Sequence, residues 1–257
     1  MVIIGGTTGL GFSAARACVE AGARVVAIGL EAPAQELGDA ARFAIADARR
    51  TAAGTDAIAL ALREFGRFDA LYHVAGGSGR RAGDGPLHDL TDEGLDFTLD
   101  LNLKSLVYSN RAAVRQFLSQ GGGGSILNMG SVLAYSPSPA HFATHAYAAA
   151  KAAVIGLTTA AASYYAPQNI RFNVLAPGVV KTPMAARAAA DQEILRFIST
   201  KQPLEGGRIG QPSDLDSAVV FFLSDQSRFV TGQVLAVDGG WGVSEGASRS
   251  SRGGEDA

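Results

Sequence analysis

A tyrosine and a lysine stand four residues apart in the segment Tyr147-Ala148-Ala149-Ala150-Lys151. In a helix this spacing puts both side chains on one face. A lysine ammonium within a few ångströms of a phenol favours the phenolate and lowers the tyrosine pKa from about 10 by roughly 1–3 units. The pair is therefore suited to general acid/base chemistry. Taken alone, such a pair is more often an ordinary one on a solvated helix face.

Two further polar residues give the pair more weight. The apolar segment 126–129 ends in Gly130-Ser131, which predicts a hydroxyl at the carboxyl end of a strand, where open parallel sheets bind ligands. Asn102 lies in a segment that we expect to be helical and offers an amide to the same crevice. Each has a structural alternative, since Ser131 can serve as a turn hydroxyl and Asn102 as a packing amide.

A glycine-rich turn, Gly5-Gly6-Thr7-Thr8-Gly9-Leu10-Gly11, follows the first apolar segment and opens a helical pattern. This is the context of a dinucleotide-binding turn, in which the helix N-terminus supplies N–H donors and a partial positive charge to the pyrophosphate. Glycines placed for turn geometry alone are the alternative. No Walker lysine follows, which counts against a nucleoside triphosphate.

The end of the second predicted strand bears on the choice between NAD and NADP. The acid that binds the ribose 2′-hydroxyl in many dinucleotide folds would here be Glu31, after Ile28-Gly29-Leu30. Neither this segment nor Thr8 supplies a base for a 2′-phosphate. We therefore expect NAD to be preferred, with NADP as the alternative.

The elements that must position these residues alternate along the chain. We expect strands at 2–4, 24–28, 42–45, 70–74, 125–129, 171–175 and 233–237, and helices at 10–21, 52–65, 94–118, 146–164 and 214–223. The strands are continuous in hydrophobicity, which is typical of strands covered on both faces. The pattern predicts an α/β fold, a doubly wound, Rossmann-like parallel sheet of about seven strands with helices on both faces.

We expect one oxidoreductase domain over residues 1–243 and a Ser/Gly/Arg/Glu-rich, disordered tail over 244–257. Residues 182–208 form a less regular insertion with a helical middle, which indicates a substrate lid. Arg80 and Arg81 follow a glycine-rich segment and are either placed to meet an anionic substrate or part of a solvated loop.

Composition excludes several classes of protein. Of 257 residues, 47% are hydrophobic and 18% charged, and the net charge of −2 provides no basic field for nucleic acid or an anionic membrane. Cys18 is the only cysteine and the four histidines are scattered, so we expect no disulfide framework and no metal site. We expect no signal peptide and no membrane span, and hence a cytoplasmic protein.

From Val2 to about Trp241 the sequence resembles the short-chain dehydrogenase/reductase family, in its single-domain branch. The matching pieces, in order, are Gly5-x-x-x-Gly9-x-Gly11, Asp47, Ala75-Gly76, Asn102, Ser131, Tyr147-x-x-x-Lys151, Asn173, Pro177-Gly178, Thr182, Thr231-Gly232 and Asp238-Gly239-Gly240. Each piece is weak alone, and their order makes the resemblance specific.

The resemblance implies hydride transfer between a nicotinamide and a ketone or secondary alcohol. Tyr147 would be the general acid/base. Lys151 would lower its pKa and bind the nicotinamide ribose, Ser131 would hold the substrate oxygen, and Asn102 would anchor a water that relays protons to Lys151. The residues implied to contact the cofactor are Gly5, Thr7, Thr8, Gly9, Leu10, Gly11, Leu30, Asp47, Ala48, Ala75, Gly76, Tyr147, Lys151, Pro177, Gly178, Val180 and Thr182. Relatives pair their long helices, which implies a homotetramer or homodimer.

The chain departs from the family pattern in three places. His73-Val74 stands where the family usually has Asn-Asn, and Ile4 where it usually has Thr. The interval from Ser131 to Tyr147 is longer than usual, which makes Ser136 and Ser138 alternative candidates for the serine.

An alternative function is a catalytically silent dinucleotide-binding sensor or scaffold, which would be free to lose the catalytic residues. An epimerase or dehydratase usually has a larger C-terminal domain, and an enoyl reductase usually spaces its tyrosine and lysine further apart.

Overall fold

Seven apolar segments form one parallel sheet in the computed structural model of the chain, which describes residues 1–246. The strands are β1 (Val2–Ile4), β2 (Val25–Gly29), β3 (Ala41–Ile45), β4 (Ala70–His73), β5 (Gly124–Met129), β6 (Ile170–Pro177) and β7 (Val234–Val237). Their order is β3-β2-β1-β4-β5-β6-β7, and all six neighbouring pairs are parallel. The order reverses between β1 and β4, the kind of switch point at which open α/β sheets bind ligands.

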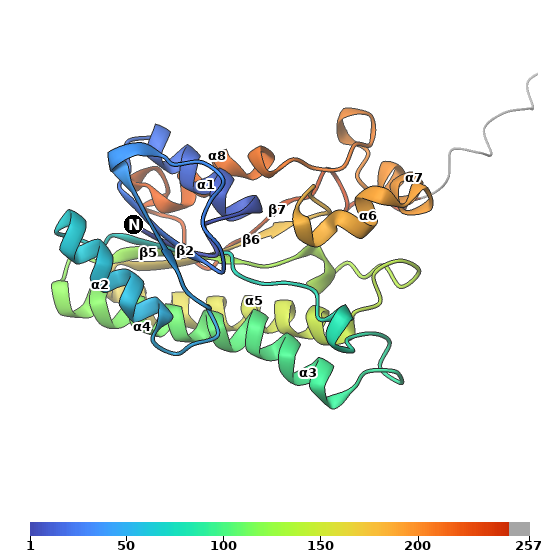
Figure 1. The fold of residues 1–257 in the computed structure, drawn as a ribbon, viewed down its shortest axis with the longest axis horizontal. Helices are drawn as coiled ribbons and strands as arrows, with labels where there is room; N and C mark the ends of the chain where they lie inside the picture. The colour runs from blue at the N-terminus through green and yellow to red at the C-terminus, as the bar shows by residue number, and fades with distance from the viewer. Residues whose placement is uncertain (247–257) are drawn as a thin grey trace, which may run out of the picture.

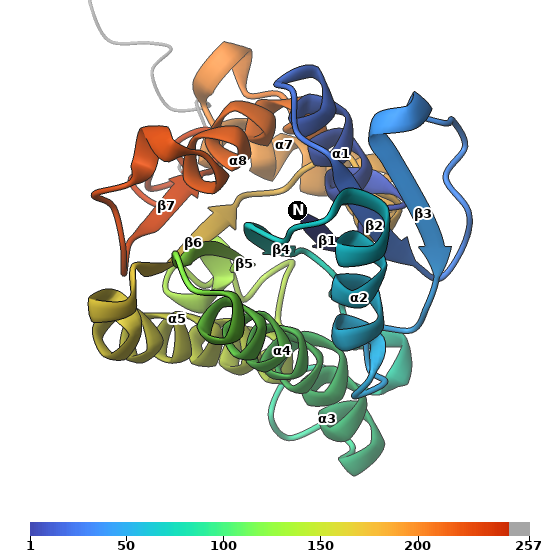
Figure 2. The same cartoon turned by 90° about the vertical axis from the view of Figure 1, so that its left-hand side faces the viewer.

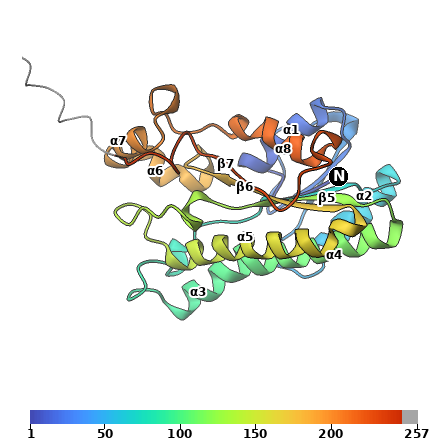
Figure 3. The ribbon, with the colours of Figure 1, turned by 180° about the vertical axis from the view of Figure 1, so that it is seen from behind.

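Helices cover both faces of this sheet, which confirms the doubly wound prediction (Figures 1 and 2). One face carries α1 (Gly9–Glu20) and α8 (Asp216–Leu223). The other carries α2 (Ala53–Phe65), α4 (Ser105–Gln120) and α5 (His145–Tyr165), with α3 (Asp92–Leu99) leading into α4. Seen from behind, α4 and α5 run side by side along the sheet (Figure 3).

The two-residue period of the strands divides the core between the faces. In β1, Val2 and Ile4 pack toward α2 and α4, whereas Ile3 packs toward α1 and α8. All three side chains are fully buried. Because burying a side chain of this size contributes about 1.5–3 kcal/mol, even a three-residue strand anchors the turn that follows it.

The predicted helix over 94–118 is interrupted. The chain passes from α3 through a π-helical segment, Asp100–Lys104, into α4. Across it, the Asn102 amide donates to the Thr98 carbonyl at 2.9 Å and the Ser105 hydroxyl, at the start of α4, donates to the Leu101 carbonyl at 2.6 Å. The hydrophobic periodicity does not reveal the extra residue, and such π-bulges occur often at functional sites.

The insertion after β6 has the helical middle that the sequence predicts, in α6 (Ala186–Ala190) and α7 (Gln192–Lys201). It lies at the end of the molecule where α5 begins (Figures 1 and 3). Of the expected tail, residues 247–257 lie outside the described residues. Within residues 1–246, no helix is long and apolar enough to cross a membrane, and no His, Cys, Asp and Glu side chains gather as a metal site.

Candidate active site

The glycine turn after β1 is packed so tightly that three of its positions, Gly5, Gly6 and Gly11, exclude a side chain. The N–H groups of Gly5 and Gly6 donate to the Ile28 carbonyl at 2.8 and 2.9 Å, which ties the turn to β2. A Cβ on Gly5 would lie 2.6 Å from the Ala75 nitrogen, and one on Gly11 would collide with the Gly5 carbonyl. These glycines therefore bring β1, α1 and the loop after β4 together.

Gly9 has a different reason to be glycine. Its φ is +52°, in the left-handed region. A Cβ on Gly9 would have room, since the nearest atom is in the Thr182 side chain, 3.6 Å away. The start of α1 thus lies beside the segment after β6. Thr8 is extended at the N-cap but its side chain makes no bond to the helix, whose first turn has no acidic residue. The N–H groups of the first turn of α1 can donate hydrogen bonds to a phosphate, so the glycine turn fits the pyrophosphate of the expected dinucleotide.

The residues expected around the adenosine lie at the carboxyl ends of β2 and β3. Leu30 is 74% exposed, while Thr7 is buried against Gly29. Asp47 accepts the backbone N–H of Arg49 at 2.9 Å and pairs with its guanidinium at 2.6 Å. The Arg49 side chain holds the pKa of Asp47 below its usual range, so this carboxylate is a charged acceptor. Ala48 follows it in the same turn.

The loop after β4 brings three of the predicted residues together. A Cβ on Gly76 would lie 2.8 Å from Asn102 Oδ1 and 3.3 Å from Lys151 Nζ. The Asn102 amide also holds Gly77, accepting its N–H at 3.0 Å and donating to its carbonyl at 2.8 Å. The glycine at position 76 is thus what lets the amide and the ammonium approach the loop.

The tyrosine and the lysine share the buried face of α5, as their spacing predicts. Lys151 is 2% exposed, and its Nζ donates to the Met129 carbonyl at 2.9 Å. The same Nζ lies 5.6 Å from the centre of the Tyr147 ring. Tyr147 is itself buried, and the Ser131 hydroxyl is a hydrogen-bond partner of its phenol. The structure thus gathers Ser131, Tyr147 and Lys151 at the ends of β5 and α5.

One expectation about this group is wrong. The pKa of Tyr147 is raised above 10, because burial disfavours the phenolate, although the hydrogen bond with Ser131 works in the opposite direction. Burial likewise lowers the pKa of Lys151 to about 8. The predicted lowering of the tyrosine pKa by Lys151 does not occur in this arrangement, because burial raises that pKa and the ammonium is directed to a carbonyl.

Of the three candidate serines, Ser131 is the one bonded to the tyrosine. Its Oγ also accepts the N–H of Leu133 at 3.2 Å, which orients the hydroxyl. Ser136 and Ser138 lie in the loop that follows. Their backbone carbonyls accept hydrogen bonds from Trp241 and Phe142. The longer interval before α5 is therefore taken up by a packed loop that leaves Ser131 in place.

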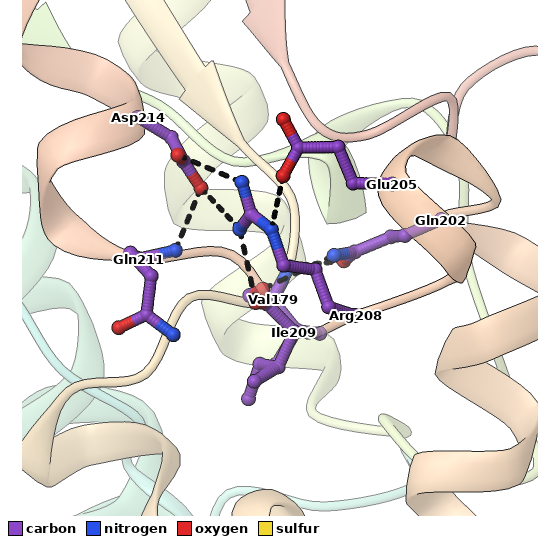
Figure 4. Close-up of polar contacts among 7 residues, drawn as sticks. All are labelled: Val179, Gln202, Glu205, Arg208, Ile209, Gln211 and Asp214. Atoms are coloured by element: carbon purple, nitrogen blue, oxygen red, sulfur yellow. Dashed lines mark hydrogen bonds and ion pairs between the residues drawn. The ribbon is translucent and has the colours of Figure 1, made fainter.

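The end of β6 and the segment after it, which carry Pro177, Gly178, Val180 and Thr182, are held by a residue that was not predicted from the sequence. The buried Gln202 accepts the Val179 N–H at 2.6 Å and donates to the Val179 carbonyl at 3.2 Å (Figure 4). A Cβ on Gly178 would lie 2.6 Å from its Oε1. Gln202 directly follows α7, so the lid supplies the hydrogen-bond partner that a neighbouring strand would otherwise give.

A second contact fixes the chain after the lid. The Arg208 guanidinium binds Asp214 at 2.6 and 3.0 Å and Glu205 at 2.6 Å (Figure 4). Between them Gly210 donates to the Val179 carbonyl at 3.0 Å. Its own carbonyl accepts the Lys181 N–H at 2.8 Å. The Arg208 ion cluster therefore holds Gly210 against the segment after β6, in addition to the contact from Gln202.

Two more buried polar residues were not identified from the sequence as site residues. The carboxylate of Asp84 accepts the N–H groups of Ala146 and Tyr147, both at 3.0 Å. His73, where the family usually has Asn, contacts the hydroxyls of Ser109 at 2.7 Å and Ser105 at 3.3 Å. Burial and the charge of Lys151 lower the pKa of His73 to about 3, so the imidazole is neutral.

Comparison with known proteins agrees with this architecture. The profile of a family described as enoyl-(acyl carrier protein) reductase matches residues 5–242. The 2-dehydro-3-deoxy-D-gluconate 5-dehydrogenase of Escherichia coli (strain K12) is 32% identical over 246 residues, which cover 93% of this chain and 94% of that protein. The cis-4-hydroxycyclohexanecarboxylate dehydrogenase of Sinomonas cyclohexanicum is 34% identical over 248 residues, covering 93% and 95%.

Among solved structures, a short-chain dehydrogenase from Leptospira borgpetersenii serovar Hardjo-bovis (strain JB197) with bound NAD+ matches with a TM-score of 0.83. It is 28% identical and the match covers 94% of this chain and 92% of that one. The profile match spans most of the chain, and the two curated relatives are dehydrogenases by name. The chain therefore belongs to the short-chain dehydrogenase/reductase family of oxidoreductases.

Proposed function

We propose that the protein is an NAD(P)-dependent dehydrogenase that interconverts a secondary alcohol and a ketone, with Tyr147 as the general acid/base. The observation that carries the proposal is the contact between the two halves of the site. Gly76 lies against both Asn102 and Lys151, and its neighbour Ala75 lies against Gly5 of the phosphate-binding turn. A dinucleotide bound along this line would end beside the tyrosine.

The nicotinamide cofactor, when bound, accepts or supplies the hydride. The glycine turn and the free start of α1 support its pyrophosphate, and Asp47 with Ala48 supports the adenine. The segment after β6 supports the nicotinamide. The proposed contacts are those implied by the family resemblance: Gly5, Thr7, Thr8, Gly9, Leu10, Gly11, Leu30, Asp47, Ala48, Ala75, Gly76, Tyr147, Lys151, Pro177, Gly178, Val180 and Thr182.

The side chains of this chain handle the proton. The Tyr147 phenol gives a proton to the substrate oxygen in reduction and takes it back in oxidation. Ser131, already a partner of the phenol, donates to the same oxygen. Lys151 is buried beside them and carries its charge below pH about 8, which favours a developing phenolate. The Asn102 amide is hydrogen-bonded to the N–H and the carbonyl of Gly77, so Asn102 shapes the loop after β4 beside the Lys151 ammonium.

We propose NAD as the preferred cofactor. Residues 29–37, after β2, contain no lysine or arginine, and Thr8 is not basic. Glu31 is exposed two residues after β2, where a carboxylate would bind a ribose 2′-hydroxyl and repel a 2′-phosphate. Initial rates with NADH and NADPH on one ketone test this, and a higher kcat/KM with NADPH would overturn it.

We propose a small hydroxy acid or keto acid as the substrate. Both curated relatives named above are named for carboxylic acids. In this chain, the Arg187 guanidinium of α6 donates to the His141 carbonyl at 3.0 Å and lies over the Phe142 ring. Arg80, in the loop after β4, has its pKa lowered by partial burial and then by the charge of Arg187. Within residues 1–246 neither arginine has a carboxylate partner. Two guanidinium groups close enough for one to lower the pKa of the other suit a substrate carboxylate.

The experiment that tests the function is an absorbance assay at the NADH band with cis-4-hydroxycyclohexanecarboxylate, 2-dehydro-3-deoxy-D-gluconate and a set of neutral secondary alcohols. The Tyr147→Phe variant is expected to lose turnover while it still binds NADH. If the parent protein binds NADH and turns over no member of the panel, or if Tyr147→Phe is as active as the parent, the catalytic proposal fails. The first result would favour the silent sensor or scaffold.

We also propose a cytoplasmic homotetramer or homodimer. The edge strand β7 exposes Val234 and Leu235, and Phe229 before it is fully exposed. Apolar residues on an open sheet edge favour pairing with another chain. The long helices α4 and α5 lie side by side on one face and offer a second surface (Figure 3). Light scattering that gives a monomer mass would contradict this assembly.

A further inference from the structure

The loop between β4 and α3 sends one carboxylate into the start of the catalytic helix. Asp84 is 3% exposed, and its Oδ1 and Oδ2 accept the N–H groups of Ala146 and Tyr147, each at 3.0 Å. The two partners are separated from it by 62 and 63 residues. The carboxylate therefore links two segments that the sequence keeps far apart.

These two N–H groups are the ones that an N-cap side chain normally binds. Helix α5 begins at His145, so Ala146 and Tyr147 are its second and third residues. The N-cap residue, Thr144, makes no side-chain bond to the helix, and the first turn has no acidic residue. Asp84 supplies the missing cap from outside the helix, and one of the capped residues is the tyrosine itself.

Asp84 is itself held in place. Its N–H donates to the Gly79 carbonyl at 3.1 Å, and a Cβ on Gly94 would lie 2.7 Å from its nitrogen. The next residue, Gly85, accepts the N–H of His145 at 3.1 Å. The loop is thus packed between the starts of α3 and α5, which makes the cap a rigid one.

We propose that Asp84 is a positioning residue for Tyr147, an inference that rests on the proposed role of that tyrosine as general acid/base. The first two turns of α5 are fixed at both ends, by Asp84 at Tyr147 and by the Lys151 bond to Met129. Without the carboxylate, two N–H groups lose their partners and the first turn frays. The phenol then loses its place beside Ser131, and a displacement of about 1 Å lowers a catalytic rate roughly a hundredfold.

The test compares Asp84→Ala and Asp84→Asn with the double variant Asp84→Ala/Thr144→Asp. An aspartate at the N-cap binds the same two N–H groups from within the helix. Two controls complete the set. Ser125→Ala removes a buried hydroxyl bond to the Phe222 carbonyl at the amino end of β5, and Tyr147→Phe removes the phenol. Turnover is followed by NADH absorbance with the panel alcohol that the parent oxidises fastest, and the amide protection of residues 144–151 by hydrogen–deuterium exchange.

We expect Asp84→Ala to lower kcat roughly a hundredfold, with the KM for NAD changed less than about threefold. Asp84→Asn keeps one acceptor and falls between Asp84→Ala and the parent. The double variant recovers at least about tenfold in kcat and regains amide protection at the start of α5. Ser125→Ala stays near the parent in kcat.

The inference is overturned if Asp84→Ala keeps kcat within about threefold of the parent, or if Thr144→Asp restores amide protection without restoring kcat. If Asp84→Ala does not fold, the kcat and the amide protection of Asp84→Asn test the inference instead. A fully active Tyr147→Phe would instead refute the role of the tyrosine. Unchanged amide protection in the Asp84 variants would refute the cap itself, so the two failures are distinguishable.

Discussion

Lys151 directs its ammonium to the Met129 carbonyl, 2.9 Å away, while it lies 5.6 Å from the centre of the Tyr147 ring. The lysine is thus bound to the end of β5, and its ammonium lies over the face of the tyrosine ring. A buried ammonium with one carbonyl partner is poorly solvated, which is why its pKa falls to about 8. This relationship links the ionisation of the site to the stability of the fold.

Lys151→Met is expected to abolish turnover and to change how stability depends on pH. Burial lowers the pKa of Lys151 from 10.5 to about 8, so the unfolded chain holds this proton more tightly than the folded one. The group therefore disfavours folding below pH 8, and this effect disappears as the pH rises from about 8 to 10.5. Urea unfolding of both proteins should show the parent gaining about 3 kcal/mol relative to Lys151→Met across that range. A difference that does not vary with pH would contradict the buried ammonium.

Ser131→Ala is expected to move the acid limb of alcohol oxidation to higher pH. The hydrogen bond from Ser131 lowers the pKa of Tyr147, so its loss leaves burial unopposed and raises that pKa further. Losing a hydroxyl that holds the reacting oxygen also lowers kcat by about 10²–10³. Profiles of kcat against pH check both effects. Ser136→Ala, in the loop that follows, is the matched control and should keep the parental profile.

Gln202→Leu is expected to raise the KM for NAD about tenfold and to affect kcat less. The substitution keeps the size of the side chain but removes both hydrogen bonds to Val179. A buried backbone group without a partner costs about 1–3 kcal/mol, and the cost falls on the segment proposed to bind the nicotinamide. Isothermal titration with NADH measures the loss directly. The exposed Gln192, at the other end of α7, gives the control Gln192→Leu, and equal losses in the two variants would speak against the clamp.

Arg187→Gln is expected to discriminate between charged and neutral substrates. If Arg187 and Arg80 bind a substrate carboxylate, the variant raises the KM for cis-4-hydroxycyclohexanecarboxylate at least about tenfold, since a hydrogen-bonded charge pair contributes about 1.5–3 kcal/mol. The KM for its methyl ester stays the same. Equal effects on the acid and the ester would show that Arg187 shapes the lid and does not bind the charge.

The sheet could be predicted from the sequence because each strand is a short, continuous apolar run, and every predicted strand overlaps an observed one. The pairing of Tyr147 with Lys151 was also predictable, since helical spacing alone puts them on one face. The interruption at Asn102 was not, because a π-turn shifts the register by a single residue without altering composition.

Two residues that bind segments far away in the sequence could not be predicted, for a different reason. Asp84 and Gln202 work by binding backbone groups, and a backbone N–H leaves no signature in the sequence of its partner. The direction of the tyrosine pKa was wrong because spacing fixes which groups are close but not how much water they keep. The geometry that places a lysine near a phenol also removes both from solvent, and burial is the largest cause of the shift in each pKa.

The neutral imidazole of His73 has a consequence for the conditions that the protein tolerates. It ends β4, fully buried against the serines of α4, and its pKa of about 3 means that the folded chain keeps it neutral in mild acid. An unfolded histidine takes up a proton near pH 6.5, so mild acid pulls the equilibrium toward the open chain, by about 2 kcal/mol at pH 5. The histidine that ends β4, where the family usually has an asparagine, thus makes the fold more sensitive to acid.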